Sequence, residues 1–197
     1  MRVISGIYKG KNLLGFDING TRPTMDRVKE SMFASIQNNI KDAVVLDLFA
    51  GSGSLGIEAL SNGASICYFV DNNKIAIDTI NKNLSNVDNG IVLNMDFKDA
   101  LKYFSDNKIK FNLILLDPPY YKNLLNDAIK LIEEYDLLNG ILVCEVEGYD
   151  VVTNYKLLKE KKYGPKEVKI YKKWKKLKIF HFFLISCRKS ESFVVYS

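Results

Sequence analysis

The sequence holds few of the residues on which metal sites and disulfide frameworks depend. Its 197 residues include one histidine and three widely spaced cysteines, Cys67, Cys144 and Cys187. These numbers argue against a structural zinc site and a disulfide framework, and reduced thiols are typical of cytoplasmic proteins. No apolar run approaches the roughly 20 residues of a membrane span, and residues 1–6 lack a signal-peptide core. We therefore expect a cytoplasmic protein with no membrane segment and no bound metal.

Acidic residues gather in the middle of the chain, although the net charge is +5. Residues 1–41 hold 7 Lys/Arg and 3 Asp/Glu, residues 42–154 hold 8 and 17, and residues 155–197 hold 13 and 3. Basic ends around an acidic body suggest a polyanionic partner that is gripped outside the core. Lysines that only keep the surface soluble would give the same charge totals. Charge alone therefore does not decide between a polyanionic partner and a merely solvated surface.

Apolar runs and amphipathic segments alternate through the middle of the chain. We expect strands at 43–48, 66–70, 91–93, 111–117 and 138–146, with helices at about 54–62, 73–84, 98–105 and 124–132. This alternation is typical of a parallel sheet with helices on both faces. After residue 150, two strands at 155–163 and 167–171 flank Gly164-Pro165, which predicts an antiparallel hairpin at the end of the sheet.

The N-terminal segment is basic and precedes the first strand of this pattern. Glycines interrupt a weak alternation over residues 2–15, which predicts a short hairpin or arm. Residues 25–39 have the spacing of an amphipathic helix, with Thr24 as its expected N-cap. Basic residues in the arm and at the helix entrance could hold phosphate, although solvated side chains are as common. These candidates are Arg2, Lys9, Lys11, Arg22 and Arg27.

A glycine turn follows the first expected strand. Gly51 to Gly56 matches G-x-G-x-x-G between a strand and a helix, and Asp71 lies 20 residues after Gly51, as in dinucleotide-binding proteins. However, Asp47 at the strand end would repel a pyrophosphate and suits a ligand with a cationic amino acid end. The chain also has no histidine near the sheet edge and no separate hydride-acceptor domain. A nicotinamide oxidoreductase remains the alternative.

S-adenosylmethionine fits three acids at successive strand ends better, because it carries a sulfonium, an ammonium and a ribose but no phosphate. Asp47 could meet the ammonium, Asp71 could bond the ribose hydroxyls, and Asp96 could accept from the adenine amino group. Each acid taken singly could equally cap a helix or lie in a solvated turn. Glycines permit close backbone approach to such a ligand. The expected cofactor-binding residues are Asp47, Phe49, Ala50, Gly51, Gly53, Asp71, Asn72, Asp96 and Phe97.

A second turn, Asp117-Pro118-Pro119-Tyr120, ends the apolar strand at 111–117. Two prolines cannot continue a central strand, and ligands of open α/β sheets bind at this carboxyl edge. Asp117 and the Pro118 carbonyl could accept the two N–H groups of an exocyclic amine while the proline pair keeps the turn rigid. Tyr120 could stack on a base that has left its helix. The turn therefore predicts methylation of a nucleobase amine.

These motifs resemble those of known enzymes. The segment from Asp47 to Gly53 resembles motif I of class I S-adenosylmethionine-dependent methyltransferases, and Asp117-Pro118-Pro119-Tyr120 resembles motif IV of the amino-methyltransferases. Together with Ser5-Gly6-x-x-Lys9-Gly10 and Thr21-Arg22-Pro23-Thr24-x-x-Arg27-Val28-x-Glu30, they make residues 1–172 similar to the RsmD family. Members of that family are bacterial enzymes that methylate N2 of a guanine in 16S ribosomal RNA.

The resemblance implies a Rossmann-like class I methyltransferase fold. Its sheet would have seven mostly parallel strands with helices on both faces, and Lys161 to Gly164 would form the turn of the final hairpin. It also implies S-adenosylmethionine as cofactor and 16S rRNA or a small-subunit assembly particle as partner. We expect a monomer, although the sequence itself carries no signal for the oligomeric state. The parts would be an RNA-binding arm and helix over 1–40, a catalytic domain over 41–172 and an extension of unknown role over 173–197.

Two further functions stay open at this point. A DNA adenine-N6 or cytosine-N4 amino-methyltransferase would use the same Asp117 turn, but it normally needs a sizeable target-recognition region for which 197 residues leave little room. A non-catalytic RNA-binding protein could retain such a fold, although the intact Asp117 turn and glycine turn argue against that loss.

Overall fold

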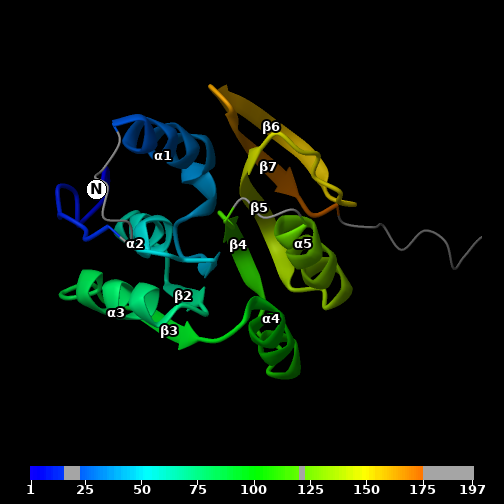
Figure 1. Cartoon of the computed structure of the whole chain (residues 1–197), viewed down its shortest axis with the longest axis horizontal. Helices are drawn as coiled ribbons and strands as arrows, with labels where there is room; N and C mark the ends of the chain where they lie inside the picture. Colours follow the sequence, from blue (N-terminus) through cyan, green and yellow to red (C-terminus); the bar gives the residue numbers. More distant parts are fainter. Residues whose placement is uncertain (16–22, 120–122, 175–197) are drawn as a thin grey trace, which may run out of the picture.

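The computed structural model describes residues 1–15, 23–119 and 123–174. Five α-helices and seven strands follow one another in these ranges (Figure 1). The helices are α1 (Pro23–Ile36), α2 (Ser54–Ser61), α3 (Lys74–Asn83), α4 (Phe97–Asp106) and α5 (Leu124–Glu134), and the short 3-10 helix η1 (Gln37–Asn39) follows α1. The strands are β1 (Val44–Leu48), β2 (Ile66–Asp71), β3 (Gly90–Asn94), β4 (Phe111–Leu116), β5 (Leu138–Glu147), β6 (Lys156–Tyr163) and β7 (Lys166–Lys172).

The strands form one sheet in the order β3-β2-β1-β4-β5-β7-β6. The first five are parallel, whereas β7 runs antiparallel to both β5 and β6. The predicted seven-stranded sheet with an antiparallel C-terminal hairpin is therefore confirmed. The chain moves outward from β1 to β3 and then returns to the other side of β1 with β4. Such a reversal places a ligand crevice at the carboxyl ends of β1 and β4.

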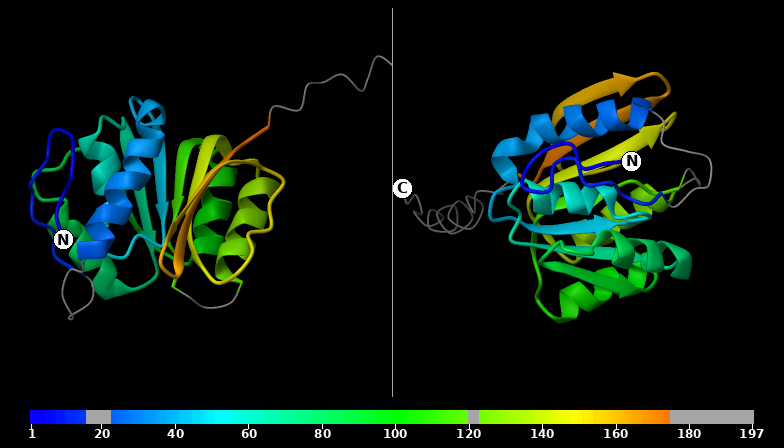
Figure 2. Two further views of the ribbon diagram at one scale, coloured as in Figure 1. Left: turned by 90° about the horizontal axis from the view of Figure 1, so that it is seen from above. Right: turned by 90° about the vertical axis from the view of Figure 1, so that its left-hand side faces the viewer.

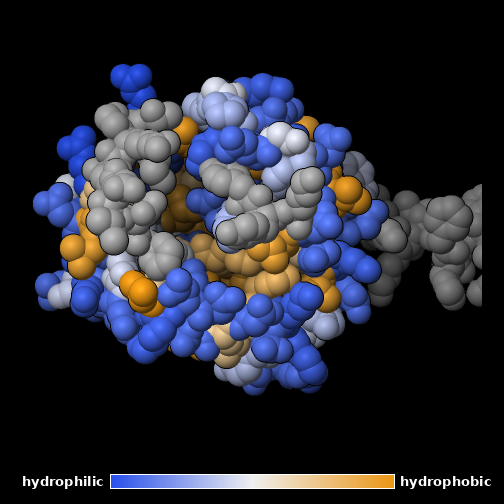
Figure 3. All heavy atoms as spheres, viewed as in Figure 1, coloured by the Kyte–Doolittle hydropathy of each residue, from blue (hydrophilic) through white to orange (hydrophobic). Residues whose placement is uncertain are grey.

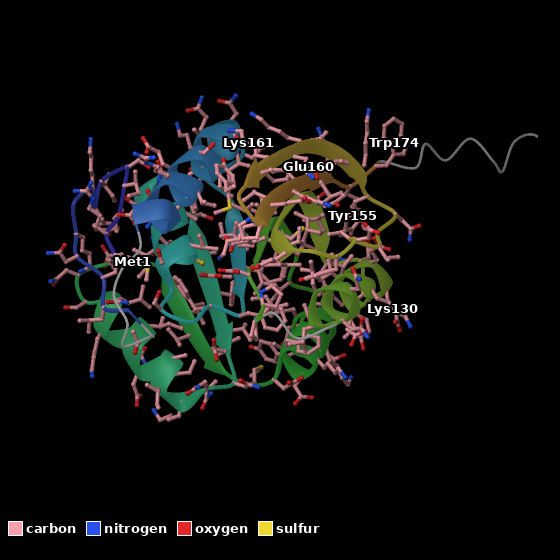
Figure 4. All side chains as sticks on the ribbon, turned by 45° about the horizontal axis from the view of Figure 1, so that its top comes forward. Met1, Lys130, Tyr155, Glu160, Lys161 and Trp174 are labelled. Carbon is pink, nitrogen blue, oxygen red and sulfur yellow. The ribbon has the colours of Figure 1, made fainter. Side chains whose placement is uncertain are left out.

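Apolar cores lie on both faces of the sheet because side chains alternate along each strand. Val45 and Leu115 point into the core under α1, α2 and α3, and the adjacent Leu46 and Leu116 point into the core with α4 and α5. Figure 2 shows the sheet between these two groups of helices. The hairpin is joined to α1 as well, since Lys161 Nζ donates to Ser31 Oγ, and Figure 4 shows Lys161 beside that helix.

The N-terminal arm is a small hairpin, as the sequence predicted. Arg2 forms an antiparallel bridge with Asn12, and both Val3 and Leu13 are buried in the core under α1, α2 and α3. The arm is thus anchored by apolar packing as well as by backbone hydrogen bonds.

Helix α1 begins before the predicted position. It starts at Pro23, so Thr24 lies inside the helix and the prediction that it is the N-cap was wrong. Proline suits a first helical position, because its fixed φ is already helical and its missing N–H would have no partner within the helix.

Hydrophilic residues cover most of the face seen in Figure 3, while apolar atoms are visible near its middle. Among the helices of the described ranges, none is long and apolar enough to cross a membrane.

Candidate active site

The glycine turn connects β1 to α2 at the carboxyl edge of the sheet. The backbone N–H groups of Phe49 and Ala50 both donate to the Val70 carbonyl, at 3.1 and 2.9 Å, which ties the turn to β2. Gly51 and Gly53 have φ of 54° and 76°, which glycine adopts without steric cost. These conformations bring the chain directly from the end of β1 to the first residue of α2.

Gly56 is the third glycine of the motif and lies where α2 packs most closely on β2. A Cβ at this position would come within 2.3 Å of Phe69 Cε1 and 2.7 Å of Cys67 Sγ. The sequence motif therefore serves helix–strand packing here, which holds the start of α2 close to the sheet.

We expect Gly56→Ala to destabilise the fold by about 1–3 kcal/mol through overpacking. Urea unfolding of the variant against the wild type measures this difference. Phe69→Leu removes the ring atoms that a new Cβ would meet, so the double variant should cost less than the two single changes added together. Additive losses would show that the contact with Phe69 is not the cause.

Asp71 holds the glycine turn in place. Its Oδ2 accepts the Gly51 N–H at 2.9 Å, and its Oδ1 accepts the Asn73 N–H at 2.8 Å. Asn73, not Asn72, caps α3 through its own side chain, and Asn72 is exposed beside it. Carboxylate oxygens have more than one lone pair each, so these bonds leave Asp71 able to accept from a ligand hydroxyl.

Asp47 is buried under the start of α2, with 1% of its surface exposed. Its Oδ2 accepts the N–H of Gly56 at 2.8 Å. Burial raises the pKa of Asp47 to about 8; the Gly56 N–H opposes the shift, and repulsion by Asp117 and Asp71 adds to it. A carboxylate in this environment is strongly stabilised by any cation that comes near it.

We expect Asp47→Asn to stabilise the ligand-free protein at pH 9 by on the order of a few kcal/mol, and far less at pH 5. The folded pKa of Asp47 lies above its unfolded value, so ionising the buried carboxylate costs stability as pH rises from about 4 to about 8. Asparagine keeps an oxygen for Gly56 and removes the charge. Urea unfolding at the two pH values measures the effect.

Asp42→Asn is the matched control for this change, because Asp42 is exposed at the entrance to β1. It should alter stability by no more than about 0.5 kcal/mol at either pH. A gain for Asp47→Asn that is the same at pH 5 and pH 9 would contradict the assignment of a buried, ionisable carboxylate.

Asp96 and Phe97 follow β3 and open α4. Asp96 is the N-cap of this helix, since its Oδ1 accepts the Lys98 N–H at 2.9 Å. The ring of Phe97 lies 5.3 Å from the ring of Phe49 in the glycine turn, tilted by 47°. The fold therefore brings two of the predicted cofactor residues into contact although 48 positions separate them in the chain.

The Asp117 turn lies at the end of β4, next to β1. Asp117 is half-buried, Pro118 is buried and Pro119 is exposed, while Tyr120 lies outside the described residues. Burial raises the pKa of Asp117 to about 7; the charge of Glu145 adds to the shift and Lys166 opposes it. The carboxylate thus lies at the predicted edge in a poorly solvated, largely acidic setting.

Basic residues of the arm and α1 line a separate cleft of about 440 Å³. Arg2, Lys9 and Arg27 meet there, together with the acidic Asp26 and Glu30. Among the described residues, none of those that line the cleft belongs to the glycine turn or the Asp117 turn.

Of the two other predicted RNA-binding residues, Lys11 is not among the described residues that line this cleft. Lys11 points elsewhere and donates to the Ser85 carbonyl after α3, and Arg22 lies outside the described residues. In the described part of the chain, no group of three or more His, Cys, Asp or Glu side chains could hold a metal ion.

The sequence interpretation missed a buried ion pair that joins the arm to the glycine turn. Lys29 Nζ lies 3.1 Å from Glu58 Oε2, and their side chains are 5% and 0% exposed. Lys29 also donates to the Arg2 carbonyl and to Ser54 Oγ, the first residue of α2. Glu58 accepts from the backbone of Ile4 and Ser5 in the arm. Glu58 as the one charged residue of α2 was the signal that could have pointed to this pair.

Comparison with known proteins gives consistent matches over most of the chain. The model of the family described as Conserved hypothetical protein 95 matches residues 1–172. The YlbH protein of Bacillus subtilis is 41% identical over 88% of this chain and 99% of its own length. Ribosomal RNA small subunit methyltransferase D of Haemophilus influenzae is 37% identical over 87% of this chain and 93% of its own. The solved structure of the Escherichia coli protein yhhF superimposes with a TM-score of 0.77 at 31% identity, covering 88% of this chain and 97% of that one.

Proposed function

The chain belongs to the Conserved hypothetical protein 95 family, the RsmD family that its motifs predicted, and on this premise we propose that it methylates 16S ribosomal RNA. The methyl group would come from S-adenosylmethionine and go to the exocyclic N2 amine of a guanine. One observation carries the proposal: the Asp117-Pro118-Pro119 turn ends β4 directly beside the glycine turn of β1, at the reversal point of the sheet.

The charges around the glycine turn favour a cationic cofactor. Asp47 and Asp71 both bond to backbone N–H groups of the motif, and a pyrophosphate would be repelled by Asp47. S-adenosylmethionine would bring an ammonium to the side of Asp47 and ribose hydroxyls to Asp71, with Asp96 and Phe97 at the adenine end. When bound, this cofactor supplies an electrophilic methyl group. The repulsion by Asp47 disfavours the nicotinamide alternative, whereas Asp71 could bond the ribose of either cofactor.

Asp117 and Pro118 would do the work on the acceptor. The lone pair of an exocyclic amine is delocalised into the base, so the site must draw it toward the methyl donor and absorb the positive charge that develops. Asp117 accepts one N–H of the amine and the Pro118 carbonyl accepts the other. Because the two prolines fix the turn, these acceptors need no rearrangement during the reaction, which is electrostatic preorganisation.

Transfer of labelled methyl from S-adenosylmethionine tests the proposal. Small-subunit RNA and assembly particles from cells that lack the gene are one set of acceptors, and genomic DNA from the same cells is the other. We expect label in the RNA and none in the DNA, and label in DNA alone would favour the amino-methyltransferase alternative. A thermal shift with S-adenosylmethionine and none with NAD would separate the cofactor classes.

We propose that residues 1–40 grip the RNA and that residues 41–172 hold the catalytic site. The cleft of Arg2, Lys9 and Arg27 supports this division, since three cations there lie on the arm and the first turns of α1. Residues 173–197 lie mostly outside the described ranges, and we assign them no role. An enzyme that acts on ribosomal RNA in a bacterium would work in the cytoplasm.

We expect the double variant Arg2→Gln/Arg27→Gln to bind RNA more weakly and to lower the slope of log K against log salt by about 1–2, because two phosphate contacts are lost. Filter binding between 50 and 300 mM salt measures the slope. Substitution is a better test than deletion of the arm, since Val3 and Leu13 belong to the core. Lys74→Gln on exposed α3 is the matched control, and an equal change in its slope would contradict the assignment.

A further inference from the structure

Two more charged side chains lie at the carboxyl edge on the strands beyond β4. Glu145 is on β5 and Lys166 is the first residue of β7, and Lys166 Nζ donates to Glu145 Oε1 in an ion pair. The two side chains are 16% and 28% exposed. Withdrawing both charges this far from water carries a desolvation cost, so the pair is a charged site that the fold maintains beside the Asp117 turn.

Asp117, Glu145 and Lys166 occupy the same face of the sheet. Leu116 of β4 lies opposite Cys144 of β5 in the parallel register, and Asp117 and Glu145 are the residues that follow them. Glu145 in turn lies opposite Val168 of β7, two residues from Lys166. Residues two positions apart on a strand lie on the same face of the sheet. The residues two positions from Asp117, Glu145 and Lys166 are Leu115, Val143 and Val168, and all three lie in the core under α1, α2 and α3.

The charges of the pair act directly on Asp117. Repulsion by Glu145 adds to the effect of burial in raising the pKa of Asp117, and attraction to Lys166 opposes it. Two poorly solvated carboxylates next to one ammonium group favour a ligand that brings N–H donors to the acids and an acceptor to the cation.

The strand order sets these groups out in a line. The acids proposed for the cofactor lie at or just after the carboxyl ends of β3, β2 and β1, and the acid proposed for the amine follows β4. The next strands in the sheet are β5 and β7, on the side of Asp117 that faces away from the glycine turn. A base whose amine reaches Asp117 therefore extends toward Glu145 and Lys166.

We infer that Glu145 and Lys166 read the Watson–Crick edge of the target guanine and so determine which base is methylated; this inference rests on the proposed function. Guanine presents its 2-amino group, N1–H and O6 in sequence, which are two donors and then an acceptor. Asp117, Glu145 and Lys166 present two acceptors and then a donor in the same sequence. Enzymes that act on a flipped base commonly read this edge by hydrogen bonds.

The same row of groups rejects the other amino bases. Adenine and cytosine carry an unprotonated ring nitrogen beside their amino group, at the place where guanine has N1–H. In both bases the lone pair of that nitrogen would face the Glu145 carboxylate. In adenine the next ring carbon also carries only hydrogen and offers Lys166 no acceptor, whereas cytosine has a carbonyl there, so Glu145 alone rejects cytosine. An acceptor that meets a lone pair in place of an N–H loses a hydrogen bond and is repelled, which supports discrimination against the wrong ligand.

A modified base tests the inference by a ratio of rates. 2,6-Diaminopurine keeps the 2-amino group of guanine but has a lone pair at N1 and an amino group in place of O6. Small-subunit RNA is assembled around a synthetic segment that carries either base at the position that the wild-type chain methylates. We measure kcat/KM for both RNAs with the full chain and with its variants. Both values for a variant come from one protein preparation. Partial misfolding therefore lowers both kcat/KM values equally and leaves their ratio unchanged.

We expect the wild type to have a higher kcat/KM with guanine than with 2,6-diaminopurine. Glu145→Gln should lower the ratio of the two values by about tenfold or more, because an amide can donate to an unprotonated N1. Lys166→Met should narrow it as well, whereas Lys166→Arg should retain it. Lys162→Met is the matched control, because it breaks another ion pair of the same hairpin, with Glu167 at 2.8 Å, in which Lys162 is 70% exposed. Its preference should equal that of the wild type.

The outcomes separate this inference from the function on which it rests. If Glu145→Gln and Lys166→Met have the same kcat/KM ratio for the two RNAs as the wild type, the inference is overturned. The proposed function still stands in that case, provided that the wild type methylates guanine. An equal narrowing in Lys162→Met also overturns it, since the effect would then belong to the hairpin in general. A wild-type chain that methylates no guanine overturns the proposed function and the inference together.

Discussion

Replacing Asp117 with alanine is expected to lower kcat for methyl transfer by about a hundred- to a thousandfold, the usual effect of removing one preorganised group. Affinity for S-adenosylmethionine should stay within about twofold, since the lost interaction belongs to the transition state and not to cofactor binding. Single-turnover rates with RNA and calorimetric titration of the cofactor measure the two quantities separately.

The surroundings of Asp117 support this division of effects. The carboxylate is half-buried and repelled by Glu145, so an amine that becomes positive gains more from it than it would in water. Asp117 also repels Asp47, and its removal should therefore not weaken the attraction of Asp47 for a cation. Asp99→Ala, on the exposed first turn of α4, should leave both quantities unchanged. Cofactor affinity that falls as far as the rate would contradict the assigned role.

Replacing Lys29 with methionine is expected to destabilise the fold by about 3–5 kcal/mol, because Glu58 would keep its charge in the interior without its cation. Glu58 is fully buried, and the groups that remain around it are backbone and hydroxyl donors of the arm. Chemical unfolding at equilibrium measures the loss. Methionine preserves the length of the buried stem, which limits the contribution from lost packing.

Lys74→Met is the control for this change. Lys74 forms an i,i+4 pair with Asp78 on α3, and the two side chains are 71% and 52% exposed. Such a pair contributes about 0–1 kcal/mol, so its loss should hardly be detected. Adding Glu58→Gln to Lys29→Met should restore part of the stability, since the uncompensated charge is gone. A double variant less stable than Lys29→Met would show that Glu58 matters through its hydrogen bonds to the arm.

The arrangement of strands and helices could be predicted from the sequence because each element has a clear local pattern. The apolar runs gave each strand to within a few residues, and Gly164-Pro165 marked the hairpin that ends the sheet. The start of α1 was misplaced for a local reason too. Proline is favoured at a first helical position, so α1 begins at Pro23, one residue before the N-cap that we predicted at Thr24.

The positions of the acids at the strand ends were predicted, but their partners within the protein were not. The spacing from Gly51 to Asp71 matched a fingerprint in which the acid bonds a ribose hydroxyl, but the hydrogen bond from the Gly51 N–H to Asp71 was not predicted. That Asp47 would bond to Gly56 could not be predicted, because it depends on how α2 returns over the sheet. The same holds for Lys29 and Glu58, whose contact depends on the docking of α1 against α2.

The basic residues show the same limit. Arg2, Lys9 and Arg27 meet in one cleft because the hairpin folds back toward α1. Lys11 lies only two residues from Lys9, yet its side chain reaches the loop after α3. Charge counted along a sequence therefore predicts that a surface is basic, but the direction of each side chain is set by the turn that carries it.

The identity of the methylated nucleoside distinguishes methylation of guanine N2 from the alternatives. RNA from a gene-deleted strain is incubated with the purified chain and S-adenosylmethionine carrying a heavy methyl group, digested to nucleosides, and examined by mass spectrometry. We expect one new labelled nucleoside, N2-methylguanosine, which Asp117→Ala fails to produce. Label in a methylated adenosine or cytidine, or label on guanosine that persists in Asp117→Ala, would contradict this expectation.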